Sequence, residues 1–241
     1  MDDLANHVYR LLSRYQELLS GVDARAEEVR DAYPGQIHCR RGCTDCCHQP
    51  FDISWLEGFY LWIGLNDLDS ETRRRVQGRA AVYLKWARDT NWGNPEVIEG
   101  TPEERAARMQ LRITEMSASH RPCPLLEDGA CLLYDYRPAV CRLAGHPLPD
   151  PVDDSALYAC YKNFEDRDLT KERVESFDVD RLYAVEASLE RELLKLITGK
   201  EASVRHTTQI AGALLTDYDR IDWGTFFETL ESETANGKRQ T

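Results

Sequence analysis

Residues 38–48 read H-C-R-R-G-C-T-D-C-C-H and place four cysteines within nine residues. The cysteines of this run are Cys39, Cys43, Cys46 and Cys47, and the chain has four more, Cys123, Cys131, Cys141 and Cys160. Thiolates are soft ligands that select zinc, copper(I) or iron-sulfur clusters, and spacings of two or three residues let neighbouring sulfurs converge on one centre. The run therefore predicts a metalloprotein.

The spacing of the run favours a loop over a helix. On a helix the first three cysteines would share one face, but Gly42 favours a tight loop that brings them together equally well. Adjacent residues point in different directions in regular structure, so we expect Cys46 and Cys47 to serve different centres, or one of them to bridge or stay a spare thiol. Burial of the four in an apolar core is disfavoured, because charged and polar residues flank them.

Two other interpretations of the spacing lack their fold context. The C-x3-C-x2-C spacing of Cys39, Cys43 and Cys46 is that of radical S-adenosylmethionine enzymes, which need a βα barrel that this chain does not predict. Asp45 also stands where those enzymes usually carry an aromatic residue. Residues 43–46 form a C-x-x-C redox motif, but without the βαβ surroundings of thioredoxin. Metal ligation remains the favoured interpretation.

Length and composition predict one domain over residues 1–241. A chain of 241 residues with 42% apolar content can bury a core without disulfide staples. The cysteine-cluster region spans about residues 36–160, between helical flanks at residues 1–33 and 165–230. The predicted fold class is mainly α, with an irregular cysteine-rich metal-binding centre framed by helices and at most a small β-hairpin.

Apolar periodicity and capping signals give the expected elements. Gly21 is expected to break or bend the first helix. A capping box at residues 54–57 opens a helix whose aromatic residues are expected to form core beneath the metal site; they are Trp55, Phe59, Tyr60 and Trp62. Asp128-Gly129 predicts a hairpin turn, and Pro138 predicts a short helix that presents Cys141. The expected helices cover residues 3–19 and 23–32, 54–65, 71–87, 101–117, 179–197 and 223–230.

Charge and the first residues of the chain bear on location and partners. No basic and apolar leader opens the sequence, and no apolar run approaches the length of a membrane span, so we expect a cytoplasmic protein in a reducing compartment. The net charge of −12 argues against nucleic acid or an anionic membrane as a partner. Oligomeric state is left open by the sequence.

The later cysteines lie in three short motifs: R-P-C-P-L-L at residues 121–126, G-A-C-L-L-Y at 129–134 and R-P-A-V-C-R at 137–142. Together with the C-x3-C-x2-C-C run they resemble the YkgJ-type cysteine-cluster family, whose members are described as zinc- or iron-chelating proteins. The resemblance covers about residues 36–160. It implies that all the cysteines are metal ligands, with Cys160 as a trailing member: Cys39, Cys43, Cys46, Cys47, Cys123, Cys131, Cys141 and Cys160.

The residues around the cysteines are compatible with either iron or zinc as the bound metal. A four-iron cluster is an anion whose potential depends on N–H donors and nearby positive charge. Arginines lie within four residues of a cysteine, although any one of them could equally cap a helix or bind a carbonyl group. They are Arg40, Arg41, Arg121, Arg137 and Arg142, of which Arg40, Arg137 and Arg142 are the predicted cofactor-binding set. Their coincidence favours iron-sulfur.

Zinc is the alternative, because eight cysteines make two closed four-thiolate sites. His38 and His48 flank the first run and could replace a cysteine, although a solvated or supporting role is commoner for such histidines. The functional hypothesis is iron-sulfur (4Fe-4S) binding for electron transfer or an undefined oxidoreductase step with a redox partner protein. The others are a zinc-stabilised interaction module and a methylase-like group-transfer enzyme, since flagellin lysine methylases carry a similar cysteine run. No nucleotide-binding or standard hydrolase motif is present.

Overall fold

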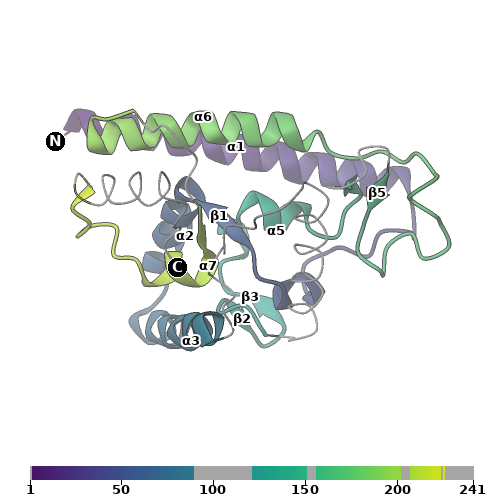
Figure 1. Ribbon diagram of the computed structural model, residues 1–241, viewed down its shortest axis with the longest axis horizontal. Coiled ribbons are helices and arrows are strands. Elements are labelled where there is room, and N and C mark those ends of the chain that lie inside the picture. Colours follow the sequence, from purple (N-terminus) through teal and green to yellow (C-terminus); the bar gives the residue numbers. More distant parts are fainter. Residues whose placement is uncertain (1, 90–120, 151–155, 202–206, 224, 226–241) are drawn as a thin grey trace, which may run out of the picture.

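The computed structural model describes residues 2–89, 121–150, 156–201, 207–223 and 225, and these form a mainly helical structure (Figure 1). This confirms the predicted fold class. The helices are α1 (Asp2–Ala32), α2 (Trp55–Asp67), α3 (Ser70–Asp89), α5 (Ala139–Leu143), α6 (Val179–Thr198) and α7 (Ile210–Leu215), with 3-10 turns η1 (Asp45–His48) and η2 (Tyr134–Tyr136). The predicted helix at 101–117, and all but the first residues of that at 223–230, lie outside the described residues.

Short antiparallel strands join the loops in pairs. The predicted hairpin is confirmed, with Asp128 and Gly129 both at positive φ in its turn, at 51° and 74°. Two further pairs were not expected, because strands of two or three residues carry no readable alternation. The pairs are β1 (Asp52–Ser54) with β6 (Thr207–Gln209), β2 (Leu126–Glu127) with β3 (Ala130–Cys131), and β4 (Leu148–Pro149) with β5 (Leu157–Tyr158).

The long helices α1 and α6 lie side by side along one edge of the molecule (Figure 1). α1 is continuous through Gly21, so the predicted break is wrong. The apolar stripe keeps its helical period across the glycine, and its burial outweighs the glycine cost of about 1 kcal/mol. Its buried members are Leu11, Tyr15, Leu19, Val22, Ala26 and Val29.

A second core lies between α2, α3 and α7. α3 begins at Ser70, as predicted, and Asp69 supplies its cap by accepting hydrogen bonds of 3.0 Å from the amides of Glu71 and Thr72. Gly64 lets α2 meet the Tyr136 ring, because a Cβ at that position would lie 2.5 Å from the ring. In the C-terminal flank, residues 165–178 are irregular and α6 follows them. The single-domain organisation stays a prediction.

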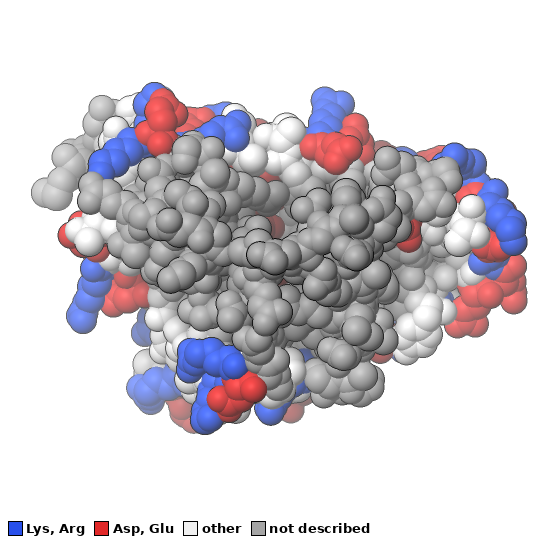
Figure 2. Space-filling view, in the orientation of Figure 1, with Lys and Arg blue, Asp and Glu red and all other residues white. Residues whose placement is uncertain are grey.

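Among the described residues, no helix combines the length and apolar character that spanning a bilayer requires. On the face shown in Figure 2, acidic and basic side chains lie next to one another, over α3 and along the edge formed by α1 and α6. The net charge of −12 is therefore not gathered into one acidic surface on the coloured part of this face.

A buried carboxylate, Glu57, joins three helices. It completes the predicted capping box of α2, because its Oε2 accepts from the Ser54 amide at 2.8 Å while its own amide donates to Ser54 Oγ at 3.2 Å. Its Oε1 accepts from the Ala139 amide, at the start of α5, at 2.8 Å. The Tyr15 hydroxyl of α1 donates to the same oxygen at 3.5 Å. Burial and then the Glu57 charge raise the pKa of Tyr15 well above its usual value.

Replacing Glu57 should destabilise the protein, and the loss should grow with the number of backbone amides that no longer have a Glu57 oxygen as acceptor. Glu57→Ala strands the buried amides of Ser54 and Ala139, which we expect to cost about 3 kcal/mol of unfolding free energy. Glu57→Gln keeps one acceptor oxygen and should cost clearly less. Urea denaturation of both variants measures the difference, and equal losses would contradict the assigned contacts.

His146 is buried after α5, with its ring 5.5 Å from that of Phe177. Its Nδ1 has no hydrogen-bond partner among the described residues. Burial, followed by the charges of Arg30 and Arg137, lowers the pKa of His146 from 6.5 to about 4. The unfolded chain therefore takes up a proton at this histidine before the folded protein does as pH falls.

This histidine should make the protein less stable in mild acid. The unfolding free energy that depends on neutral His146 is fully present above pH 6.5 and is lost as pH falls towards 4. The loss should reach about 2 kcal/mol at pH 5. His146→Phe should remove that part of the pH dependence, whereas substitution of exposed His7 by Gln should leave it unchanged. Urea denaturation at pH 7.5 and pH 5 tests this, and an unaltered pH dependence in His146→Phe would contradict it.

Candidate metal centre

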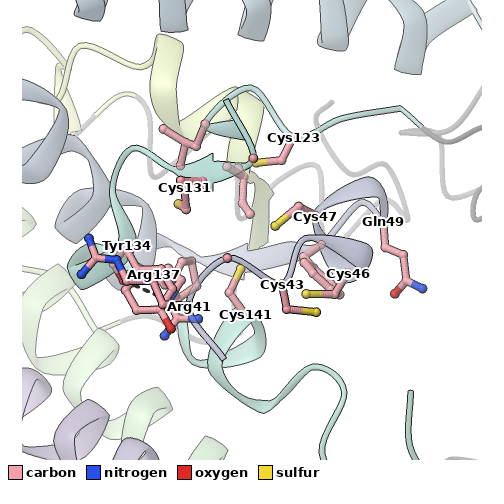
Figure 3. Close-up of a pocket in the computed structure, with 17 residues that line it drawn as sticks. Arg41, Cys43, Cys46, Cys47, Gln49, Cys123, Cys131, Tyr134, Arg137 and Cys141 are labelled. Atoms are coloured by element: carbon pink, nitrogen blue, oxygen red, sulfur yellow. Dashed lines mark hydrogen bonds between the residues drawn. The ribbon is translucent and has the colours of Figure 1, made fainter. Parts of the chain in front are cut away.

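Six of the eight cysteines line one cavity of about 60 Å³. They come from the first cysteine run, from the β2–β3 hairpin and its approach, and from α5, and Figure 3 shows them around the same space. The six are Cys43, Cys46, Cys47, Cys123, Cys131 and Cys141. None of the eight cysteines forms a disulfide. The structure thus brings both halves of the cysteine pattern together.

The first wall of the cavity is a loop, as Gly42 predicts. The Cys43 amide donates to Arg40 O at 3.0 Å across Gly42, whose φ is +92°. The chain then enters η1, where the Cys47 amide donates to Thr44 O at 2.9 Å. This 3-10 turn lets the adjacent Cys46 and Cys47 line the same cavity. Whether both bind one centre, or one of them bridges or stays a spare thiol, remains a prediction.

The other walls are fixed to the first by backbone and buried contacts. The Cys123 amide donates to Cys47 O at 2.7 Å, which ties the hairpin segment to the cysteine loop. Cys131 lies in β3, directly opposite Leu126. Cys141 lies in the short helix that Pro138 was predicted to open, and its amide donates to Pro138 O at 3.1 Å. Glu57 holds the first amide of that helix.

The cavity is a poor place for uncompensated thiolates. Burial raises the pKa of Cys123 to about 12 and that of Cys141 well above its usual value. The pKa of Cys131 is also raised, mainly by burial, and that of Cys46 chiefly by its hydrogen bond with Cys47. These four thiols therefore stay protonated on their own, and a bound cation would supply the charge that favours their thiolate forms.

Two arginines flank the cavity together with Tyr134. The guanidinium carbon of Arg137 lies 3.6 Å from the centre of the Tyr134 ring, and that of Arg41 lies 4.7 Å from it. All three residues line the cavity and gather on one side of it in Figure 3. These contacts hold two positive charges beside the sulfurs.

Only one of the three predicted cofactor-binding arginines, Arg137, lines the cavity. Arg40 is exposed. Arg142 is buried and turned to other partners: it donates to Arg137 O at 2.9 Å and to Asp135 O at 2.7 Å, and it pairs with Asp23 of α1. It acts as a carbonyl-binding arginine, the alternative that the sequence left open.

Cys39 and Cys160 lie outside the cavity lining, beside Gly145. The Cys39 sulfur accepts a hydrogen bond of 3.2 Å from Asn163 Nδ2, and burial raises the Cys39 pKa to about 11. The same Asn163 nitrogen donates to Gly145 O at 2.6 Å, as does the Cys160 amide at 3.2 Å. Burial also raises the pKa of Cys160.

The histidines and aromatic residues of the sequence prediction lie elsewhere. His38 is exposed, and the His48 ring lies against Thr44 O at 3.1 Å; neither lines the cavity. The four aromatic residues of α2 are core residues, as expected, but none of them lines the cavity, and Tyr60 shares a core with Ala139 and Leu143 of α5. Trp55, Phe59 and Trp62 pack with Tyr218 and Trp223, and Tyr60 packs with Tyr15 and Tyr136.

Sequence reasoning missed several residues of the cavity wall. Tyr134 belongs to the Y-x-x-R-P motif that precedes Cys141, so its place beside Arg137 could have been suspected. Phe51 and Ile210 carry no such signal, because they reach the cavity only through the pairing of β1 with β6. Asn163 and Gly145, which surround Cys39, are likewise ordinary in sequence.

The donor set fits a thiophilic metal better than any other group. Six reduced cysteines line the space, with positive charge beside them. In the part of the chain that the structure describes, no group of three or more His, Cys, Asp or Glu side chains is arranged so that it could hold a metal ion. Residues that would hold a metal are therefore identified by the cavity they line rather than by a finished coordination shell.

Gly145 should tolerate alanine less well than another glycine of similar backbone conformation. Gly145 and Gly35 both have positive φ, +95° and +75°. A Cβ at Gly145 would lie 2.6 Å from the Cys39 sulfur, whereas nothing lies within 4 Å of one at Gly35. We expect Gly35→Ala to cost about 1 kcal/mol and Gly145→Ala clearly more in urea denaturation. Equal costs would contradict the close approach of Cys39.

Comparison with models of known protein families, with curated proteins and with solved structures gives no match for the chain. The resemblance to the YkgJ-type family thus rests on the cysteine motifs alone and stays a prediction. The functional proposal therefore rests on the geometry of the cavity and on the cysteines that line it.

Proposed function

We propose that the protein binds an iron-sulfur cluster of the 4Fe-4S type in the six-cysteine cavity and serves in electron transfer or a related redox step. The observation that carries the proposal is the convergence of six reduced cysteines, from the loop, the hairpin and α5, on one cavity. Iron-sulfur clusters are held by cysteine thiolates, usually four, so the cavity offers more than enough ligands.

The size of the cavity supports a multinuclear centre over a single ion. A cavity needs a volume of about 10–15 Å³ to hold one water molecule. A mononuclear zinc site is compact, because four sulfurs close it at about 2.3 Å from the metal. The cavity of about 60 Å³ between the cysteines is several times larger than a single small body requires. A compact cluster of several iron and sulfide atoms uses that space better.

The charges around the cavity support a redox role. A thiolate-ligated cluster is an anion, and nearby positive charge stabilises it, particularly when it gains an electron. Arg41 and Arg137 are held beside the sulfurs by Tyr134. The cluster itself would supply the one-electron chemistry. The residues of this chain hold it, limit its contact with water and set its charge environment.

Zinc binding without turnover is the second candidate. It is favoured by the short elements between residues 121 and 150, where two-residue strands and single helical turns depend on cross-links for their stability. The two candidates make opposite predictions for colour, iron content and reducibility.

Anaerobic purification followed by metal analysis and visible spectroscopy tests the proposal. We expect a brown protein with about four irons and a charge-transfer band that dithionite bleaches. Cys131→Ser should lose most of this iron, whereas Cys39→Ser, outside the cavity lining, should retain more of it. A colourless protein that holds zinc and takes up no iron on anaerobic reconstitution with ferrous iron and sulfide would overturn the proposal.

Arg137→Gln provides a variant that keeps every cysteine. Loss of the positive charge beside the cavity should lower the reduction potential without lowering iron content, because an electron added to the cluster is then less well compensated. Arg40→Gln is the matched control, since Arg40 is exposed and lies outside the lining. Equal potentials in Arg137→Gln and Arg40→Gln, measured by redox titration, would count against the assigned role of Arg137.

A further inference from the structure

A second hollow, separate from the cysteine cavity, runs along α3. This groove has a volume of about 480 Å³ and lies between α3 and residues 121–126. Its walls carry three arginines, Arg75, Arg79 and Arg121, and apolar surface from Val82, Pro122 and Leu126. In a chain of net charge −12, three arginines around one groove make a local positive site.

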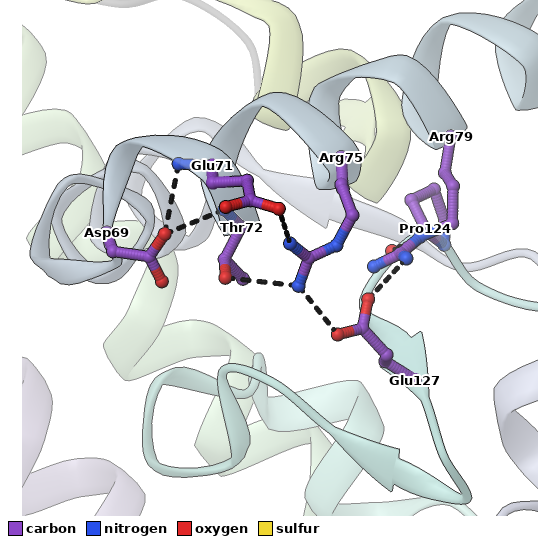
Figure 4. Close-up of polar contacts among 7 residues, drawn as sticks. All are labelled: Asp69, Glu71, Thr72, Arg75, Arg79, Pro124 and Glu127. Carbon is purple, nitrogen blue, oxygen red and sulfur yellow. Dashed lines mark hydrogen bonds and ion pairs between the residues drawn. The ribbon is translucent and has the colours of Figure 1, made fainter.

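The carboxylates near the groove neutralise only part of this charge (Figure 4). Glu127 is shared by two arginines, at 3.0 Å from Arg75 and 2.5 Å from Arg79. Glu71 adds a longer contact of 3.5 Å to Arg75 and is largely exposed. Arg121 makes no ion pair within the described residues; its guanidinium lies over the Trp86 ring at 5.3 Å. The charge of Asp69 also acts on Arg75. The acidic side chains therefore offset Arg75 and Arg79, and Arg121 is the arginine of the groove without an ion pair among the described residues.

Arg79 is a fixed part of the groove wall. Its Nε donates to Pro124 O at 2.8 Å and its Nη1 binds Glu127, so the guanidinium is held in place. Its Nη2 is shielded from solvent and has no hydrogen-bond partner in the part of the chain that the structure describes. Arg79 therefore contributes a fixed positive charge to the wall of the groove, and its Nη2 is not exposed to a ligand there.

We propose that this groove binds a small organic anion through a carboxylate or phosphate group. Arg121 holds the anionic group, the fixed charge of Arg79 favours it, and Val82, Pro122 and Leu126 contact the apolar part of the ligand. The volume lies within the range of about 300–1,000 Å³ that is typical of small-molecule sites, which favours a small ligand over a docked protein. Cys123 lines both the groove and the cysteine cavity, so the ligand lies against a wall of the proposed metal site.

Isothermal titration calorimetry with phenyl phosphate, benzoate and phenol tests the site on the full-length protein. We expect at least one of the two anions to bind, more weakly as salt is added, and neutral phenol to bind much less. Phenol binding as tight as the anions, or no binding of either anion, would overturn the proposal. Preference for phenyl phosphate or for benzoate identifies which anionic group the site takes.

Variants on α3 and beside it locate the binding. Arg121→Gln should weaken anion binding at least about tenfold, and so should Arg79→Gln, although the latter also loses its contacts with Pro124 and Glu127. Arg74→Gln is the control, because Arg74 is exposed on the same helix outside the groove lining. Unchanged affinity in Arg121→Gln would overturn the assignment. The metal content of Arg121→Gln should match the wild type, so failure of this proposal is distinguishable from failure of metal binding.

Discussion

The buried carboxylate of Glu57 is the contact on which the arrangement of the helices around the cysteines depends. One side chain caps α2, accepts the first amide of α5 and meets a tyrosine of α1. α5 has only five residues, so it has little stability of its own and takes its position from Glu57 and from the anchoring of Arg142 to Asp23. Cys141 is thus placed by the contacts of Ala139 and Arg142, which do not themselves line the cavity.

The cysteine cavity is assembled where regular structure gives way to turns. A 3-10 turn presents Cys46 and Cys47 together, a hairpin presents Cys131, and one amide-to-carbonyl bond from Cys123 to Cys47 joins the two. Leu125 and Leu133 bury the hairpin segment in the core beside α3, and a bound metal would order the turns further. The groove along α3 adds a positively charged surface that shares Cys123 with the cavity.

Most of the helical frame could be predicted, because helix signals are local. The capping box of α2, the stripe of α1 and the Asp128-Gly129 turn all act within a few residues. The pairing of β1 with β6, the route by which Phe51 and Ile210 reach the cavity, is fixed by packing between distant segments. The donor types were readable from the cysteine motifs, but the division of the eight into six around the cavity and two beside Gly145 was not.

The continuity of α1 through Gly21 gives the first thirty-two residues a part in building the cysteine site. Tyr15 and Asp23 lie two turns apart on this helix. Tyr15 contacts Glu57 and Asp23 pairs with Arg142, and these two partners fix the position of α5. A shortened chain that starts at residue 36 would contain every cysteine and still leave both of those side chains without their partners on α1. The smallest piece able to assemble the site is thus larger than the stretch that bears its sulfur atoms.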